Sequence, residues 1–304
     1  MNFDHLFPLG YGAGSLGTAL TGDAAIRHVA LYLEAGGNVF DTAHVYACWQ
    51  PGGVGASERE LGHVLKQLGV LEKAVIVTKG GHPAFGTEYP RPAHFLAPEV
   101  LQQDITESCE RLGVERIPIY LLHRDDGITP VVEILEPLQD ARLGAIGVSN
   151  WSVERIAEAN AVAAAQGRKG FALSQIQGSL ATPSWPITAD PTTRYLTPTE
   201  IAFGLPLMFY SATAGGYFAG KPARLYDTPE NAARKERAEQ LAEKYGATAT
   251  QIALAWLRSL PLPTLPLFGT TDEAHLREIL GAASLTLTPD EAHWLTEGDT
   301  SERA

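Results

Sequence analysis

Short apolar runs alternate with longer amphipathic segments over most of the chain. The apolar runs contain too few residues for a helix, and their Val, Ile, Leu and Phe side chains favour β-strands. Each run is bounded by glycine, proline or polar residues, as expected for a buried strand that leaves the core at both ends. The predicted strands cover residues 38–40, 74–78, 117–122, 145–148, 171–174, 206–209 and 264–268.

The segments between these runs carry apolar residues at helical spacing and are predicted to be helices. Asp23 is expected to cap the first helix, and Ser57 with Glu60 is expected to form a capping box at the start of the second. Pro137 can kink the helix that contains it. The predicted helices cover residues 23–35, 57–68, 98–112, 131–141, 152–166, 229–245, 250–259 and 272–280, with a last one from residue 289.

This alternation of strand and helix is typical of a parallel sheet covered by helices, with one unit roughly every 30 to 40 residues. Eight such units close a (β/α)8 TIM barrel, which commonly needs about 250 residues. The 304 residues of the chain would suit one such barrel or two ordinary domains. Since no repeat, linker or charge run marks a boundary, we expect a single α/β barrel domain over residues 1–304.

Three of the predicted strands finish on ionisable residues. Asp41, Lys79 and His123 each follow a strand directly, and Tyr46 comes five residues after Asp41. Taken alone, Asp41 or Lys79 could be a solvated charge on a loop, and His123 could simply satisfy backbone hydrogen bonds. In a parallel barrel, however, the carboxyl ends of all strands lie on one face, so we expect the four side chains to meet there.

The glycines at residues 12–17 match the letters of the G-x-G-x-x-G dinucleotide fingerprint. That motif is informative only between a strand and a helix, and no helical pattern follows here. We therefore favour glycines that allow close backbone approach after a short strand. Trp49 and Trp185, on long loops after strands, are candidates for lining a substrate pocket, although either could pack loops together; for Trp151 packing is favoured.

Composition narrows the class of protein further. A net charge of −12 and a pI near 5.2 argue against a nucleic-acid partner. Cys48 and Cys109 show neither metal-type spacing nor a paired framework, so a reducing compartment is expected, with a disulfide between them left open. The first residues lack signal-peptide features and no window approaches 18 apolar residues, which predicts a cytoplasmic protein outside the membrane. Composition leaves the oligomeric state undetermined.

A metal site near the strand ends is not expected. His44, Arg124, Asp125 and Asp126 lie close in sequence to the strand-end residues. They lack paired ligand spacing, and Arg124 would add positive charge beside a cation.

Seven stretches together resemble the aldo-keto reductases, which are barrel enzymes that use a nicotinamide cofactor. The resemblance runs from Gly10 to about Ala283, and four residues of catalytic type match in the right order. The matching stretches are FDTAHVY, VTKGG, LLHRDD, GVSNW, SQIQ, FYSATAGGYFAGK and LFGTTDEAHLREIL.

The resemblance implies an NAD(P)H-dependent reductase of aldehydes or ketones, with sugar-type or small aldehydes as candidate substrates. Tyr46 would protonate the carbonyl oxygen, which requires a nearby cation because a free phenol has a pKa of about 10. Lys79 would supply that charge, Asp41 would hold Lys79 by an ion pair, and His123 would orient the carbonyl.

The resemblance also implies a set of cofactor-binding residues. Ser149, Asn150 and Gln175 would hold the nicotinamide carboxamide, and the nicotinamide would stack on Tyr210. The residues expected along the pyrophosphate and the adenosine are Ser211, Gly216, Lys221, Phe268, Gly269, Thr270, Thr271, His275 and Glu278.

Two departures from the family pattern affect the cofactor. Many relatives place Lys or Arg after the last strand, beside the 2′-phosphate of NADP, whereas this chain has Asp272 and Glu273 there. Carboxylates repel a phosphate, so NADH is favoured over NADPH. His275 stands where Arg or Gln is common, and Ile279 where Asn usually touches adenine.

Two other functions are compatible with the same barrel. One is a sensor or scaffold that binds nicotinamide without turnover, although a pure binder would not need an acid at Tyr46. The other is an isomerase or hydrolase that uses Asp41 and His123. Reduction of a small-molecule carbonyl substrate is the favoured interpretation.

Overall fold

The computed structural model describes residues 1–185 and 192–298 and contains eight parallel strands. They are β1 (Gly10–Gly12), β2 (Val39–Asp41), β3 (Val75–Gly80), β4 (Ile117–Leu122), β5 (Leu143–Ser149), β6 (Ser174–Gln177), β7 (Leu207–Tyr210) and β8 (Thr264–Phe268). Each strand pairs with the next along the chain, and β1 also pairs with β8, so the sheet closes into a barrel. The predicted (β/α)8 fold is confirmed.

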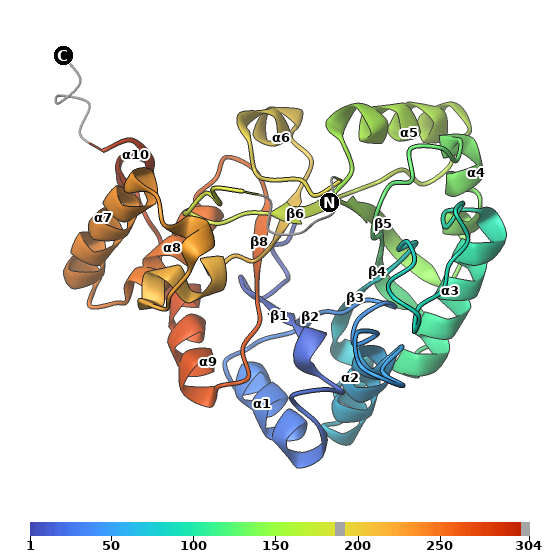
Figure 1. Ribbon diagram of the computed structural model, residues 1–304, viewed down its shortest axis with the longest axis horizontal. Helices are drawn as coiled ribbons and strands as arrows, with labels where there is room; N and C mark the ends of the chain where they lie inside the picture. Colours follow the sequence, from blue (N-terminus) through green and yellow to red (C-terminus); the bar gives the residue numbers. More distant parts are fainter. Residues whose placement is uncertain (186–191, 299–304) are drawn as a thin grey trace.

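Helices form an outer ring around the strands (Figure 1). They are α1 (Gly22–Glu34), α2 (Ala56–Gln67), α3 (Pro98–Leu112), α4 (Val131–Leu135), α5 (Val153–Ala165), α6 (Pro198–Phe203), α7 (Pro229–Tyr245), α8 (Ala249–Arg258), α9 (Glu273–Leu280) and α10 (Pro289–Glu297). Short 3-10 helices, η1 to η6, cover Ala13–Ser15, Leu71–Lys73, Pro137–Gln139, Ala214–Ala219, Arg224–Tyr226 and Gly281–Ser284.

One apolar cluster contains side chains from opposite sides of the barrel. Strands β2, β3, β4, β7 and β8 contribute to it, and Phe3 and Leu6 from the N-terminal segment join them. Because side chains alternate between the two faces of a strand, Asp41 lies on the same face as Val39, and Lys79 on the same face as Val77. Two charged side chains therefore continue an apolar stack toward the carboxyl ends of their strands.

Both predicted helix caps are wrong. Asp23 lies inside the first turn of α1, whose N-cap is Thr21. Glu60 accepts a hydrogen bond from the backbone N–H of Gly22 at 2.7 Å, so it serves α1 and not its own helix. The hydroxyl of Ser57 donates to the carbonyl of Ala13 at 2.8 Å, and α2 begins after a left-handed glycine. Tertiary partners have displaced the local caps.

Two predicted elements differ from the observed ones by three residues or more. The strand expected at 171–174 begins at Ser174, although the backbone N–H of Ala172 already donates to Ile146. The helix expected at 131–141 ends at Leu135, because Pro137 cannot continue its hydrogen bonding and starts a 3-10 turn.

Several smaller predictions can also be compared with the structure. Cys48 and Cys109 are both free and buried. Trp151 is buried and packs edge-on against Phe171, so it packs the barrel as favoured above. Within residues 1–185 and 192–298, no helix is both long and apolar enough to cross a membrane.

The glycine at position 62 should resist even the smallest side chain. A Cβ at Gly62 would lie 2.3 Å from the carbonyl oxygen of Leu112, where α2 crosses α3. Alanine is normally the better helix former, but here the clash with a backbone atom should dominate. We expect Gly62→Ala to lower the free energy of unfolding by about 1–3 kcal/mol in urea titrations. His63→Ala, at the exposed neighbouring position, is the matched control and should change stability by less than about 0.5 kcal/mol.

Candidate functional site

Asp41, Lys79 and Tyr46 meet at the carboxyl ends of β2 and β3. The Lys79 ammonium donates hydrogen bonds to Asp41 Oδ1 at 2.6 Å, to the carbonyl of Thr42 at 2.8 Å and to the Tyr46 hydroxyl at 3.1 Å. His123 follows β4 directly, and its ring centroid lies 5.9 Å from that of Tyr46. The structure therefore brings together all four strand-end residues predicted from the sequence.

Lys79 is a fully buried ammonium with a complete set of partners. Its side chain has 0% relative exposure and Asp41 has 4%. Burial alone would lower the pKa of Lys79, but Asp41 and Tyr46 raise it above its ordinary value. The other carboxylate oxygen of Asp41 accepts a hydrogen bond from Gln175 at 2.7 Å. Lys79 consequently remains charged beside the phenol.

The phenol and the imidazole are both neutral at pH 7. Burial raises the pKa of the Tyr46 hydroxyl, and the charge of Lys79 opposes this increase without cancelling it. The expected lowering of the phenol pKa by Lys79 is therefore present but outweighed. Burial, followed by the charges of His82, Lys79 and Arg124, lowers the pKa of His123 well below its ordinary value. Tyr46 thus retains a proton to donate, and His123 is an uncharged hydrogen-bonding group.

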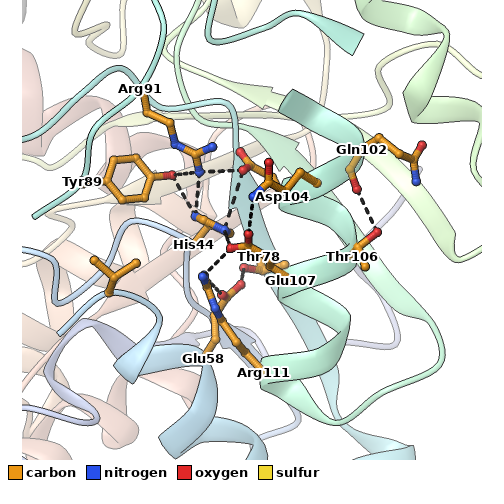
Figure 2. Close-up of polar contacts among 12 residues, drawn as sticks. His44, Glu58, Thr78, Tyr89, Arg91, Gln102, Asp104, Thr106, Glu107 and Arg111 are labelled. Carbon is orange, nitrogen blue, oxygen red and sulfur yellow. Dashed lines mark hydrogen bonds and ion pairs between the residues drawn. The ribbon is translucent and has the colours of Figure 1, made fainter. Parts of the chain in front are cut away.

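A buried polar network holds the loop that carries Tyr46 (Figure 2). Arg91 donates to His44 Nδ1 at 3.1 Å, and since a guanidinium can only donate, Nδ1 is the accepting nitrogen. His44 Nε2 then donates to Glu107 on α3 at 2.8 Å. Tyr89 also contacts His44 Nδ1, at 2.8 Å, and receives a hydrogen bond from Arg91. The loop after β2 is thereby tied to α3 and to the loop after β3.

The same network fixes the outer face of β3. Thr78, next to Lys79 in the strand, donates to Glu58 on α2 at 2.6 Å, and Arg111 on α3 pairs with Glu58 at 3.3 Å. Asp104 accepts from the backbone N–H of Gly81 at 2.8 Å and pairs with Arg91 at 2.6 Å. The strand that carries Lys79 is therefore held by polar contacts on the face opposite the ammonium.

A groove of about 570 Å³ opens beside Tyr46. Its lining joins the barrel mouth to the loops after β1, β7 and β8. The lining residues are Gly12, Gly14, Ser15, Asp41, Tyr46, Trp49, Tyr210, Ser211, Lys221, Leu267, Phe268, Gly269, Thr270 and Thr271. Seven of the predicted cofactor residues, from the last residues of β7 and β8 and from the loops that follow them, line this groove, as does Trp49.

A second cavity of about 210 Å³ adjoins the groove. Lys221, Gly269 and Thr270 line both, so the two cavities lie next to each other. The residues of the second cavity are Thr213, Gly215, Gly216, Ala219, Lys221, Thr250, Gly269, Thr270, His275, Glu278 and Ile279. Gly216, His275 and Glu278, predicted for the pyrophosphate and adenosine, lie here.

Ser149, Asn150 and Gln175 are buried at the ends of β5 and β6 and line neither cavity. Asn150 donates to Ser149 at 2.9 Å and accepts from the Tyr210 hydroxyl at 2.8 Å. These contacts position Tyr210 at the groove. The amide of Gln175 is directed at Asp41, as described above.

Strained backbone occurs at or close to residues that line the groove. Among the described residues, the non-glycine positions with φ in the left-handed region are Ala47, Asn150, Ser211 and Ala214, with φ of 74°, 61°, 55° and 49°. Ala47 follows Tyr46, Asn150 and Ser211 are predicted cofactor residues, and Ala214 lies in the loop between Ser211 and Gly216. Such conformations cost about 1–3 kcal/mol each and concentrate at functional sites. Their placement supports the groove as the site of function.

Some predicted residues lie away from the groove. Trp185 is 55% exposed and lines neither cavity, whereas Trp49 is 52% exposed and lines the groove. Asp272 caps α9 by accepting from the N–H of His275 at 2.9 Å, and Glu273 is 3.9 Å from Arg27. Neither carboxylate lines either cavity; the hydrogen bond from the backbone N–H of His275, followed by the charges of His275 and Lys221, lowers the pKa of Asp272.

Sequence reasoning missed part of the lining. The groove includes Gly12 and Gly14, whose G-x-G-x-x-G pattern was not interpreted as a dinucleotide-binding motif. The predicted close backbone approach is confirmed, since a Cβ at Gly12 would lie 2.8 Å from the carbonyl oxygen of Phe268. Thr250 comes from α8 and had no local signal. Across the two described ranges, no group of three or more His, Cys, Asp or Glu residues could hold a metal ion.

The barrel and this site agree with a comparison of the chain to known families. A sequence model of the aldo/keto reductase family matches residues 8–298, and the chain belongs to that family. The resemblance drawn from seven short motifs is thus confirmed. Membership makes the chain an oxidoreductase of carbonyl compounds in general terms, in a family whose members use NAD(P)H.

The relatives are distant but extend over most of the chain. A probable aldo-keto reductase 1 of Glycine max is 29% identical, over 92% of this chain and 82% of its own. A 6-dehydroglucose reductase of Novosphingobium aromaticivorans is 28% identical, over 89% of this chain and 83% of its own. A putative voltage-gated potassium channel subunit beta of Schizosaccharomyces pombe is 25% identical, over 84% of this chain and 78% of its own.

The network around His44 should make stability depend on acid pH. Chiefly because His44 donates to it, the pKa of Glu107 falls from 4.5 to about 2. A folded-state pKa below the unfolded value gives stability that is full above about pH 4.5 and is lost as the pH falls toward 2. In urea titrations between pH 7 and pH 3, we expect the midpoint of Glu107→Gln to fall less than that of the wild type. Glu110→Gln, exposed on the same helix, should follow the wild type; a parallel decline of all three proteins would contradict the assignment.

Proposed function

We propose that the protein is an NAD(P)H-dependent reductase of aldehydes or ketones in which Tyr46 is the general acid. The observation that carries the proposal is the Tyr46 hydroxyl 3.1 Å from a fully buried ammonium, beside an elongated groove. A phenol beside a cation can release its proton to a developing alkoxide, because the cation stabilises the resulting phenolate, and this attraction is stronger in a medium of low dielectric constant.

The groove fits a nicotinamide dinucleotide. The two adjoining cavities together give the elongated shape that such a cofactor needs, and the absence of side chains at Gly215 and Gly269 leaves room for phosphates and sugars. At the nicotinamide end, Tyr210 would face the ring from the groove, and Ser149, Asn150 and Gln175, which are buried behind the lining, would support it through their contacts with Tyr210 and Asp41. The pyrophosphate would lie along Ser211, Gly216 and Lys221, and the adenosine along Phe268, Gly269, Thr270, Thr271, His275 and Glu278. When bound, the reduced nicotinamide supplies a hydride.

Each of the four strand-end residues has a distinct role in the proposal. Tyr46 donates its proton to the carbonyl oxygen, and Lys79 stabilises the phenolate that remains. Asp41, helped by the Thr42 carbonyl, keeps Lys79 charged and in place. Neutral His123 is a hydrogen-bonding group that orients the carbonyl next to Tyr46.

For the cofactor we propose NADH over NADPH. The sequence-based reason was repulsion from Asp272 and Glu273, which lie outside the two linings. The support now comes chiefly from Glu278, which lines the adenosine cavity and accepts from Thr248 at 2.8 Å. Together with Asp272 it offsets the charge of Lys221, so an added phosphate would meet little net attraction.

Removal of the phenol hydroxyl should separate turnover from binding. We expect Tyr46→Phe to lower kcat about 10²- to 10⁴-fold with small aldehydes, the range for loss of a general acid, while NADH still binds. Oxidation of NADH followed by absorbance gives the rate, and quenching of tryptophan fluorescence gives the affinity. Near-normal turnover by the variant would contradict the role of Tyr46. A wild-type protein that binds NADH but reduces no aldehyde or ketone would favour the sensor or scaffold instead.

Cofactor preference should depend on Glu278 and not on Glu273. Fluorescence titrations of the wild type should give a lower Kd for NADH than for NADPH. Glu278→Gln keeps an acceptor for Thr248 but removes the charge, so we expect NADPH to gain roughly fivefold relative to NADH, about 1 kcal/mol. Glu273→Gln, outside the linings, is the control and should leave the ratio unchanged. Tighter binding of NADPH by the wild type would refute the proposed preference.

A further inference from the structure

The turn that carries Tyr46 is attached to the strand that carries the ammonium. The backbone N–H of His44, two residues before Tyr46, donates to the carbonyl of Lys79 at 2.9 Å. Ala47 follows Tyr46 with a φ of 74°, in a region that a non-glycine residue occupies only when its surroundings hold it there. The distance between the Tyr46 hydroxyl and the Lys79 ammonium therefore depends on how firmly residues 42–55, the loop after β2, are held.

A tyrosine from the loop after β3, residues 81–97, packs against this turn. Tyr89 is buried, and its hydroxyl lies 2.8 Å from His44 Nδ1. Its ring belongs to an apolar cluster whose members in the loop after β2 include Ala43, Val45 and Cys48. One phenol thus gives the loop of the proposed acid both an apolar contact and a polar one.

Arg91, two residues further along the same loop, contacts both Tyr89 and His44 (Figure 2). It donates to His44 Nδ1 at 3.1 Å and to the Tyr89 hydroxyl, and its charge lies 4.4 Å from the centroid of the Tyr89 ring. It also donates to Asp104 Oδ1 on α3 at 2.6 Å. The other carboxylate oxygen of Asp104 accepts from the backbone N–H of Gly81, which follows β3. Arg91 therefore joins the loop of the proposed acid to α3 and to the end of β3.

This arrangement depends on the shape of the guanidinium group. Its N–H donors lie in a fixed plane and can serve several acceptors at once, whereas the ammonium of a lysine is a compact point charge. The side chain of Arg91 is 10% exposed and that of Asp104 is 0% exposed, so the ion pair is largely removed from water. A buried carboxylate of this kind requires its cation. Asp104 thus fixes the guanidinium, which in turn fixes His44 and Tyr89.

We propose that Arg91 is a positioning residue that keeps the Tyr46 hydroxyl within hydrogen-bonding distance of Lys79. The inference rests on the proposed function and deepens it, since it assigns the geometry of the acid to a side chain of the neighbouring loop. Arg91 lines neither cavity, so it acts through His44 and Tyr89 and touches neither cofactor nor substrate. Without it the loop after β2 loosens, and the phenolate left by proton transfer loses the nearby charge that stabilises it.

The first test separates turnover from cofactor binding. Arg91→Lys keeps a charge beside Asp104 but cannot reach His44 and Tyr89 together, so we expect kcat with small aldehydes to fall about ten- to hundredfold, the range for a misplaced group. The Kd for NADH should change by less than about twofold, because Arg91 lies outside both linings. A general loss of structure would weaken NADH binding as well and would contradict the positioning role.

A paired variant controls for loss of stability. Arg91→Met combined with Asp104→Asn removes both charges together, so no buried carboxylate is left without its cation, and we expect a similar fall in kcat. Arg142→Met combined with Asp140→Asn is the matched control, because it removes another Arg–Asp pair, whose guanidinium contacts Thr106 on α3. The control should leave kcat unchanged. Wild-type kcat in both Arg91 variants would overturn the inference and retain the reductase.

The second test follows the loop itself by hydrogen–deuterium exchange and needs no substrate. Amides of residues 42–55 should exchange faster in the paired Arg91 variant than in the wild type, whereas those of β7 and β8 should not change. The Arg142 control should exchange like the wild type over residues 42–55. Faster exchange in a protein that reduces no aldehyde or ketone would refute the proposed function and retain the role of Arg91 in holding the loop. Unchanged exchange over residues 42–55 would refute that role, whatever the activity.

Discussion

The ion pair between Lys79 and Asp41 is the interaction on which the site depends. An ammonium with no exposed surface is strongly destabilising unless a charge and hydrogen bonds compensate for lost hydration, and Asp41 with the Thr42 carbonyl provides both. The two residues end neighbouring strands, so the pairing of β2 with β3 sets the distance between them. The third donor position of the ammonium is directed at Tyr46, which links the phenol to the rigid barrel.

Strand β3 is fixed from both of its faces. Lys79 faces the interior with the apolar stack, while the adjacent Thr78 faces outward to Glu58 and, through it, to Arg111. Because side chains alternate between the two faces of a strand, the neighbouring side chains of Thr78 and Lys79 must point to opposite faces. His44 extends the same polar network into the loop of Tyr46. The position of the Tyr46 hydroxyl relative to the Lys79 ammonium therefore depends on two sets of contacts. The hydrogen bonds between strands hold Lys79 in the barrel, and the polar network on the outer face of β3 holds the strand and the loop of Tyr46.

Local patterns predicted the elements well and their ends less well. Strands as short as β2 were found because Val and Phe precede a charged residue, and long helices such as α3 because their apolar residues recur at helical spacing. The predicted caps at Asp23 and Ser57 were wrong because partners distant in sequence took their place. Glu60 accepts from the backbone N–H of Gly22 at the start of α1, and the Ser57 hydroxyl donates to the carbonyl of Ala13. For the site, family motifs located the four strand-end residues, whereas Thr250 came from a helix that carries no motif and reaches the second cavity only through folding.

By itself, the sequence determined the alternation of strands and helices, the fold class and the ionisable residues at the strand ends, since all of these follow from spacing along the backbone. The tertiary structure alone decided which groups face each other. Gln175 meets Asp41 across 134 residues, Glu60 serves another helix, and Asp272 and Glu273 lie outside the linings that their sequence position suggested. Such contacts depend on barrel closure and helix packing, where side chains distant in sequence compete for the same buried polar atoms, and no local pattern encodes the outcome of that competition.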